Sequence, residues 1–156
     1  MKTKGYVDKK GTRVTRYSFI KIIEYNVADV NEVVERLERL KVTKFNFINI
    51  PEFTYKVHDN KLKIESEFIK GWYCLDVNSI YNDLVNSEWT FTDPHPSNFM
   101  TCKQNQKTYA LDLDSFNYIP LIEDRKKLWL KYNNQWPVWP YRTHKFDENG
   151  IIENDP

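Results

Sequence analysis

The chain has 156 residues, 23 basic and 22 acidic side chains, a formal net charge of +1, and 15% aromatic residues. This length favours a single domain with a real core, and the composition excludes a disordered or low-complexity protein. The balanced charge argues against a nucleic-acid partner, no apolar run approaches the roughly 18 residues of a membrane span, and the basic, polar N-terminus predicts a cytoplasmic protein without a secretory signal.

Strands dominate the prediction for the first half of the chain. We expect a hairpin over 6–17 with Gly11 in its turn, strands over 17–25, 45–50, 53–57 and 61–69, and a helix over 27–41. The strand at 17–25 is apolar on both faces except for Lys21 and Glu24, which makes Lys21 unusual there. On the helix, Glu38 falls on the flank of the apolar stripe and is the acid best placed to reach inward, whereas Glu35 points towards water.

For the second half of the chain, the sequence predicts two more helices, with a short loop between them in the sequence. We expect a helix over 77–86, a strand over 89–92, a loop over 93–98, a hairpin with strands over 99–102 and 107–113, a helix over 122–132, and an irregular tail that frays from residue 149. Two prolines bracket His95 and make its loop rigid and exposed. Trp136 and Trp139 in the tail fit a cover for the core or an oligomer contact.

Glycine and cysteine usage narrows the chemistry further. The four glycines, at positions 5, 11, 71 and 150, form neither a G-x-G-x-x-G motif nor a Walker P-loop. Any nucleotide site would therefore have to hold its phosphates with a lysine and a metal. Cys74 and Cys102 lie far apart and predict free, buried thiols rather than a disulfide or a zinc site.

The rigid loop and the hairpin after it carry three side chains with a common chemistry. Asp93 and Asn98 lie five residues apart on the loop, and Asp112 ends the hairpin. Asn98 and Asp112 offer hard oxygen ligands of the kind that Mg²⁺ takes when it also binds phosphates. Asp93 could accept a hydroxyl proton, so the spacing favours phosphoryl transfer.

Four segments resemble motifs of the protein kinase-like superfamily. Segment 93–98 (DPHPSN) resembles its catalytic loop, in the D-x-H-P-x-N form of the aminoglycoside phosphotransferase and UbiB groups, and 111–114 (LDLD) resembles the metal-binding D-F-G segment. Segment 19–21 (FIK) looks like the strand lysine of V-A-I-K, and 67–71 (EFIKG) resembles the hinge. The order of these features matches the family, and the resemblance covers roughly residues 6–125.

The resemblance implies an α+β, reduced bilobal kinase-like fold in one domain over 1–156. It would have an antiparallel N-lobe sheet with one helix over 1–68, a truncated C-lobe over 72–132, and an aromatic tail over 133–156. It also implies ATP and Mg²⁺ as cofactors. The implied site residues are Asp93, Lys21, Glu38 and His95 for catalysis, Lys21, Glu67 and Ile69 for the nucleotide, and Asn98, Asp112 and Asp114 for the metal.

In these roles Asp93 would orient the acceptor hydroxyl, Lys21 would bind the phosphates, and Glu38, or alternatively Glu35, would hold Lys21. The resemblance therefore implies an ATP-dependent phosphotransferase that acts on a hydroxyl of a small molecule, sugar or lipid headgroup. The missing helical lobe and the glycine-poor hairpin keep a second function open, a nucleotide-binding or scaffold pseudokinase. A structural interaction protein, including a homo-oligomer, is the third class.

Several of these residues also have simpler interpretations. Lys21 fits an edge residue whose ammonium reaches water. His95 fits a residue that only hydrogen-bonds its own loop. Asp112 and Asp114 taken alone fit two turn acids, or the D-x-D of metal-dependent glycosyltransferases, which would need a larger nucleotide-sugar domain than this chain provides.

Overall fold

The structure is a computed structural model of the chain, and it describes residues 6–7, 12–14, 18–24, 27–74, 76–92, 96–133, 144–147 and 150–153. These residues form three α-helices together with antiparallel and parallel strand pairs, so the predicted α+β class is confirmed. The chain divides into two compact units. The first comprises Met1–Lys41 and Pro51–Ile69, and the second comprises Val42–Ile50 and Lys70–Pro156.

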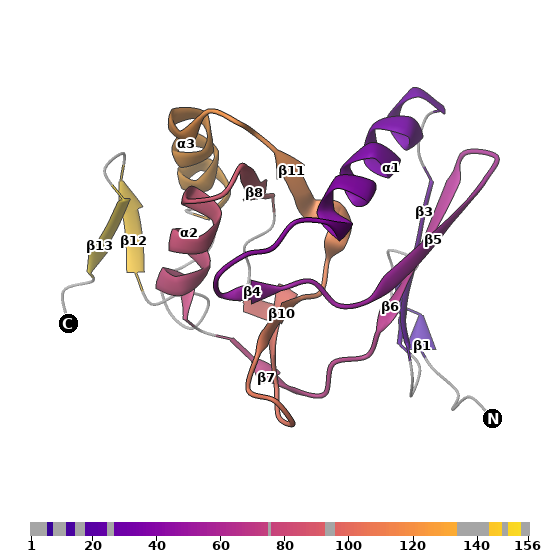
Figure 1. Cartoon of the computed structure of the whole chain (residues 1–156), viewed down its shortest axis with the longest axis horizontal. Helices are drawn as coiled ribbons and strands as arrows, with labels where there is room; N and C mark the ends of the chain where they lie inside the picture. Colours follow the sequence, from indigo (N-terminus) through magenta and orange to yellow (C-terminus); the bar gives the residue numbers. More distant parts are fainter. Residues whose placement is uncertain are drawn as a thin grey trace. The chain divides into compact units, whose positions relative to one another are not determined.

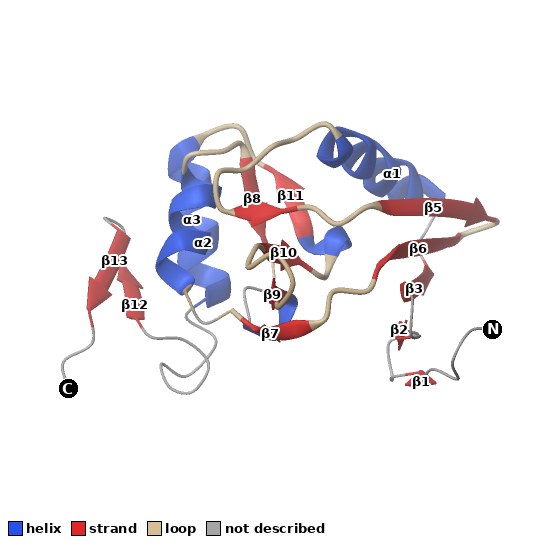
Figure 2. Ribbon diagram, turned by 60° about the horizontal axis from the view of Figure 1, so that its bottom comes forward, coloured by secondary structure: helices blue, strands red, loops and turns tan. Residues whose placement is uncertain are grey.

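A five-stranded antiparallel sheet with the order β1-β2-β3-β6-β5 forms the first unit (Figures 1 and 2). Its strands are β1 (Tyr6–Val7), β2 (Thr12–Val14), β3 (Ser18–Glu24), β5 (Phe53–His58) and β6 (Lys61–Glu67). The turn between β5 and β6 is tight, and Asp59 there has a φ of 55°. Aspartate tolerates this left-handed conformation better than most residues, which explains why the hairpin turns at this point.

Helix α1 (Val27–Lys41) lies over one face of this sheet (Figure 2). Its apolar residues recur at helical spacing and are buried, namely Val30, Val33, Leu37 and Leu40. The facing side of β6 contributes Leu62, Ile64 and Ser66, all three of which are buried. The bounds of α1 are the predicted ones. Its apolar residues are removed from solvent by packing against this face of the sheet.

The second unit contains a four-stranded sheet with the order β4-β10-β9-β7 and a separate strand pair β8-β11. The elements are β4 (Ile48–Asn49), β7 (Gly71–Tyr73), α2 (Val77–Val85), β8 (Trp89–Phe91), β9 (Phe99–Cys102), β10 (Thr108–Ala110), β11 (Phe116–Tyr118), α3 (Ile122–Asn133), and the hairpin β12 (His144–Asp147) and β13 (Gly150–Glu153). Its core holds Phe91 between Phe99 and Phe116, with ring centroids 4.9 Å from Phe91 in both cases. Tyr81 of α2 packs on Trp129 of α3 at 5.3 Å.

Asp83 on α2 is a buried carboxylate that holds the segment before β4. It accepts hydrogen bonds from the backbone N–H groups of Asn46 at 2.8 Å, Phe47 at 3.0 Å and Ile48 at 2.6 Å. The side chain is only 5% exposed, and these three donors replace the water that the carboxylate loses. The segment therefore bends around Asp83, and β4 is shorter than the predicted strand over 45–50.

Arg125 on α3 is a buried cation of this unit. Its guanidinium donates to the carbonyl oxygens of Ile119 and Pro120, both at 2.8 Å, and to that of Val85 at 2.7 Å. Burial lowers the pKa of Arg125, and the nearby Glu88 carboxylate partly offsets this effect. Because the carbonyl of Val85 belongs to the last turn of α2, Arg125 ties the end of α2 to α3.

Most predicted elements are confirmed, and the differences have local causes. Helices α2 and α3 and the hairpins β5-β6 and β9-β10 lie where expected, and Cys74 and Cys102 are free and buried. We expected the hairpin of strands 53–57 and 61–69 to end at Gly71, whereas Gly71 begins β7 and pairs with β9, where a Cβ would lie 1.8 Å from the Thr101 carbonyl oxygen. The tail forms the hairpin β12-β13 where we expected fraying from residue 149. Trp136 and Trp139 lie outside the described residues.

The membrane prediction concerns helices only. In the part of the chain that the structure describes, no helix has both the length and the apolar character that crossing a membrane would require.

Candidate functional site

Two of the predicted catalytic residues, Asp93 and His95, lie outside the described residues. The structure describes the chain on both sides of them. Thr92 follows β8, and a short 3-10 turn at Pro96–Asn98 leads directly into β9. The contacts of Thr92 and of Pro96–Asn98 therefore define where the loop begins and ends.

Backbone pairing brings both ends of this loop to the segment after β10. The N–H of Thr92 donates to the carbonyl oxygen of Ser115 at 2.9 Å, next to the paired residues Phe91 and Phe116 of β8 and β11. The N–H of Leu111 donates to the carbonyl oxygen of Asn98 at 2.8 Å, which extends the β9-β10 ladder by one residue. The backbone therefore places Asn98 and Asp112 at the same end of the β9-β10 hairpin.

Ser115 fixes the side chain of Asp112. Its hydroxyl donates to Oδ2 of Asp112 at 2.6 Å, and its backbone N–H donates to the Asp112 carbonyl oxygen at 3.1 Å. Ser115 is 7% exposed, while Asp112 is half-buried. Serine or threonine three residues after an aspartate is a local hydrogen-bonding pattern that the sequence contains, and it could have identified Ser115. Our sequence analysis missed this residue.

The donor set at this hairpin end suits a hard cation. Asn98 carries an amide oxygen and Asp112 a carboxylate, and Mg²⁺ in phosphate sites takes only one or two carboxylates because phosphates and water supply the other ligands. Asp114 lies in the 3-10 turn Leu113–Ser115 and is half-buried. Among the side chains that the structure describes, no group of three or more His, Cys, Asp or Glu residues could hold a metal ion. The predicted metal site would therefore depend on the pair Asn98 and Asp112 together with phosphate and water oxygens.

Lys21 lies on the side of the first unit's sheet that α1 covers. In the strand register Lys21 of β3 is directly opposite Ile64 of β6, and Ile64 is opposite Tyr55 of β5. Directly opposite residues of antiparallel strands point to the same face, so these three side chains form one row. Ile64 is buried and Lys21 is half-buried. The side chain of Lys21 therefore lies on the face of the sheet against which α1 packs.

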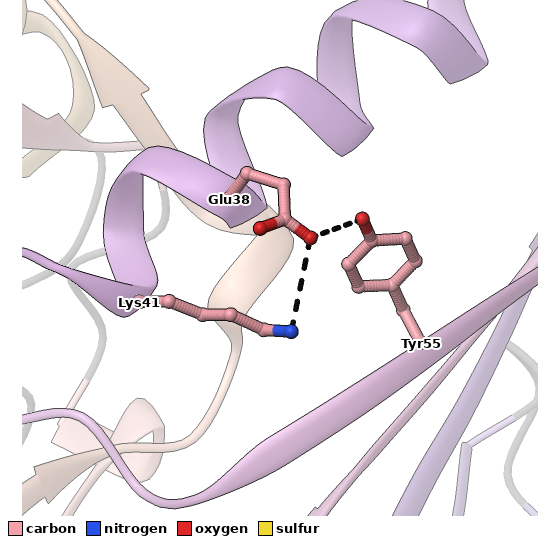
Figure 3. Close-up of polar contacts among 3 residues, drawn as sticks. All are labelled: Glu38, Lys41 and Tyr55. Atoms are coloured by element: carbon pink, nitrogen blue, oxygen red, sulfur yellow. Dashed lines mark hydrogen bonds and ion pairs between the residues drawn. The ribbon is translucent and has the colours of Figure 1, made fainter.

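Glu38 approaches the same face from the helix. Tyr55 Oη donates a hydrogen bond to Oε1 of Glu38, and Lys41 Nζ lies 3.8 Å from the same oxygen (Figure 3). The hydrogen bond from Tyr55 to Glu38 raises the pKa of Tyr55, with smaller contributions from burial and from the charge of Glu38. The predicted pairing of Glu38 with Lys21 stays a prediction, as does the alternative with Glu35, which is exposed on α1.

The predicted hinge residues have different environments. The N–H of Glu67 donates to the carbonyl oxygen of Glu52 at 3.0 Å, and Oε1 of Glu67 accepts from the N–H of Glu52 at 3.1 Å. Ile69 is 6% exposed. Glu67 is therefore bound to the neighbouring chain segment through both backbone and side chain.

Comparison with protein-family models finds no match, and neither does comparison with curated proteins. Among solved structures, the chain is similar to the bifunctional kinase-methyltransferase WbdD, with a TM-score of 0.48 and 12% sequence identity. The similar region covers 80% of this chain and 34% of the other, so the chain spans about a third of that protein's length. A similarity at this TM-score and identity carries no argument about the function of this chain.

Proposed function

We propose that the chain is an ATP- and Mg²⁺-dependent phosphotransferase that acts on a hydroxyl of a small molecule, sugar or lipid headgroup. One observation carries the proposal. The hydrogen bond from the N–H of Leu111 to the carbonyl oxygen of Asn98 joins the last residue of segment 93–98 to the first residue of segment 111–114, at one end of the β9-β10 hairpin. One residue from each of the two segments that resemble phosphoryl-transfer motifs is thereby a neighbour of the other.

The second unit would supply the acceptor and metal chemistry. Asp93 would accept the proton of the acceptor hydroxyl, with His95 beside it in the same loop. Asn98 and Asp112 would hold Mg²⁺, with Asp114 next to them. When bound, the ion would neutralise charge on the phosphate oxygens. The bond from Ser115 would keep the Asp112 carboxylate in one orientation, which limits the entropy lost when a ligand binds.

The first unit would supply nucleotide binding. Lys21 would bind phosphate oxygens as a point charge, and its half-buried position on the sheet would strengthen that interaction relative to open water. Glu38 would hold the lysine. Because the N–H of Glu67 is already paired with Glu52, adenine recognition would fall to backbone groups beyond it, towards Ile69.

The first experiment measures Mg²⁺-dependent nucleotide binding. We expect ATP with Mg²⁺ to raise the melting temperature, since a ligand at 100 times its dissociation constant adds about 2.7 kcal/mol. Asp112→Asn should abolish the magnesium-dependent part of the shift without unfolding the protein. Asp124→Asn is the matched control, because Asp124 is an exposed acid on α3, and it should keep the full shift. An unchanged shift in Asp112→Asn would reject the metal assignment.

The second experiment measures turnover. The protein, ATP, Mg²⁺ and a panel of sugars, amino alcohols and lipid headgroups are incubated together, and ADP and phosphorylated products are compared with those of Asp93→Ala. Product above this control supports the phosphotransferase. Binding of ATP without product would instead favour the nucleotide-binding pseudokinase, and the absence of both would reject the two functions together.

Ser115→Ala tests the geometry of the site without touching a metal ligand. It removes the hydroxyl bonded to Oδ2 of Asp112 and leaves the backbone bonds of Ser115 in place. Partners that orient a metal ligand are typically worth about 10–100-fold in metal affinity, so the Mg²⁺ concentration required for ATP binding should rise by at least about 10-fold. An unchanged Mg²⁺ requirement would show that Asp112 does not depend on Ser115 for this role.

A further inference from the structure

Glu38, Tyr55 and Lys41 form a compact cluster within the first unit (Figure 3). Tyr55 Oη donates to Oε1 of Glu38, and Lys41 Nζ lies 3.8 Å from that oxygen. Lys41 Nζ also lies 5.0 Å from the ring centroid of Tyr55 and 5.3 Å from that of Phe53. An ammonium near the faces of two rings gains a cation–π attraction in addition to its ion pair. Strand β5 therefore binds the last turn of α1 through the hydroxyl of Tyr55 and through the two aromatic rings, while the ion pair between Lys41 and Glu38 lies within the helix.

Both contacts of this cluster use the same carboxylate oxygen. In the part of the chain that the structure describes, Oε2 of Glu38 makes no hydrogen bond or ion pair, and Figure 3 shows it directed away from the Tyr55 hydroxyl. A carboxylate offers about four lone-pair sites on its two oxygens, so holding one oxygen leaves the other able to accept a bond from a cation.

The strand register links this cluster to the predicted phosphate-binding lysine. Tyr55, Ile64 and Lys21 form one row across β5, β6 and β3, on the face that α1 covers. Neighbouring strands lie about 4.8 Å apart, so the backbones at Tyr55 and Lys21 are separated by about two such steps. The long side chains of Lys21 and Glu38 can span that separation across Ile64, the one residue between Lys21 and Tyr55 in the row. A carboxylate bonded to Tyr55 is therefore held on the sheet face that carries Lys21, about two strand spacings from the backbone of that lysine.

We propose that Tyr55 and Lys41 are positioning residues that hold Glu38 by one oxygen and present the other to Lys21. The inference rests on the proposed nucleotide-binding function and extends it by naming the groups that preorganise the Lys21–Glu38 pair. Glu38 needs such support because its side chain is 54% exposed and would otherwise sample many rotamers. Tyr55 is rigid beyond its two torsions and Lys41 is held near two rings, so together they restrict the carboxylate.

The first test examines the cluster without any ligand. The chain is labelled with ¹³C at the ζ carbon of tyrosine, and the Tyr55 resonance, assigned with Tyr55→Phe, is followed through an alkaline pH titration. The pKa of Tyr55 should lie above its ordinary value in the wild type and fall towards that value in Glu38→Gln. A Tyr55 that titrates identically in both proteins would show that the hydroxyl is not bonded to Glu38 in solution and would overturn the inference.

The second test is a double-mutant cycle on ATP affinity with Tyr55→Phe, Lys21→Met and the double variant. Tyr55→Phe keeps the ring beside Lys41 and removes only the hydroxyl, so we expect a folded protein with about 3- to 10-fold weaker ATP binding. In the Lys21→Met background the same change should have no further effect, because Glu38 then has no lysine to position. The matched control is Tyr118→Phe, which removes a tyrosine–glutamate hydrogen bond of 2.8 Å in the second unit and should leave the affinity unchanged.

The outcomes separate this inference from the proposed function. A wild type that binds ATP through Lys21 while Tyr55→Phe binds equally well overturns the positioning role alone. Tighter binding by Tyr55→Phe also overturns it, because the hydroxyl would then hold Glu38 away from the lysine. A wild type that binds no ATP overturns the proposed function, and with it this extension, whatever the titration of Tyr55 shows.

Discussion

Removing the Asp83 carboxylate should destabilise the second unit by an amount that the structure allows us to estimate. The N–H of Ile48 donates to Asp83 in a fully buried position, and those of Asn46 and Phe47 donate in partly buried ones. A hydrogen bond to a charged group contributes about 1.5–3 kcal/mol, and the partly buried donors can recover some of this from water. Taking about 2 kcal/mol for Ile48 and about 1 kcal/mol for each of the others, Asp83→Ala should cost about 4 kcal/mol.

Asp83→Asn should cost about half as much, because its single carbonyl oxygen can still accept from Phe47 and Ile48, which share Oδ2 in the wild type. In this variant only the backbone N–H of Asn46 loses its acceptor, because the amide NH₂ group replaces the oxygen to which it donates. At about 2–4 °C per kcal/mol for a chain of this size, the melting temperature should fall by about 8–16 °C in Asp83→Ala and by about 4–8 °C in Asp83→Asn.

The assay combines urea unfolding, followed by tryptophan fluorescence, with amide hydrogen exchange. The exchange of the Ile48 N–H should accelerate most in Asp83→Ala, since its bond is the buried one. Asp124→Ala serves as the control and should change stability by no more than about 0.5 kcal/mol, as expected for an exposed residue. If Asp83→Ala unfolds at the same urea concentration as this control, the carboxylate does not hold the 45–49 segment and the reasoning fails.

Three further predictions concern other contacts. Arg125→Met leaves three carbonyl oxygens without their donor and should lower the free energy of unfolding by about 3 kcal/mol in the same urea assay; a loss below about 1 kcal/mol would contradict the anchoring role. Gly71→Ala places a Cβ 1.8 Å from the backbone oxygen of Thr101, so β7 must shift away from β9 and amide exchange at Thr101 should accelerate, whereas unchanged exchange would refute the close approach. The raised pKa of Tyr55 means that the bond to Glu38 stabilises the fold fully below the phenol's unfolded pKa and is lost as the pH rises through the folded pKa. The stability difference between wild type and Tyr55→Phe should therefore be constant below about pH 9 and shrink above about pH 10, and a difference that persists at high pH would count against the bond.

The helices and hairpins could be predicted because their signals are local. The apolar residues of α1 recur at helical spacing, and the alternation in β5 and β6 on either side of a polar turn is typical of a hairpin. Strand β7 could not be predicted in this way. It forms by pairing with β9, which lies about 30 residues further along the chain, and Gly71 allows the close approach to Thr101 that this pairing requires. The shortening of β4 likewise depends on Asp83, more than 30 residues away.

The sequence suggests the residue types of the candidate site, and the roles of these residues stay predictions. The chemistry of Asp93, Asn98 and Asp112 is visible in the sequence, and the ladder bond that joins 98 to 111 follows once the β9-β10 hairpin is expected. The groups that orient the side chains of Asp112 and Glu38 are harder to identify from the sequence. Ser115 lies three residues from Asp112 and had a detectable local pattern, but Tyr55 reaches Glu38 only through the packing of a helix on a sheet, and no spacing rule connects them.

The route of the chain between its two units constrains how the protein can be dissected. Residues 42–50 lie in sequence between α1 and β5, yet they are grouped with the second unit, where β4 pairs with β10. Neither unit is thus a continuous stretch of polypeptide, and no single proteolytic cut or truncation can release one whole. A fragment ending at residue 69 would carry β4 away from its only sheet partner in the described structure, so recombinant halves would have to be designed with residues 42–50 replaced by a linker.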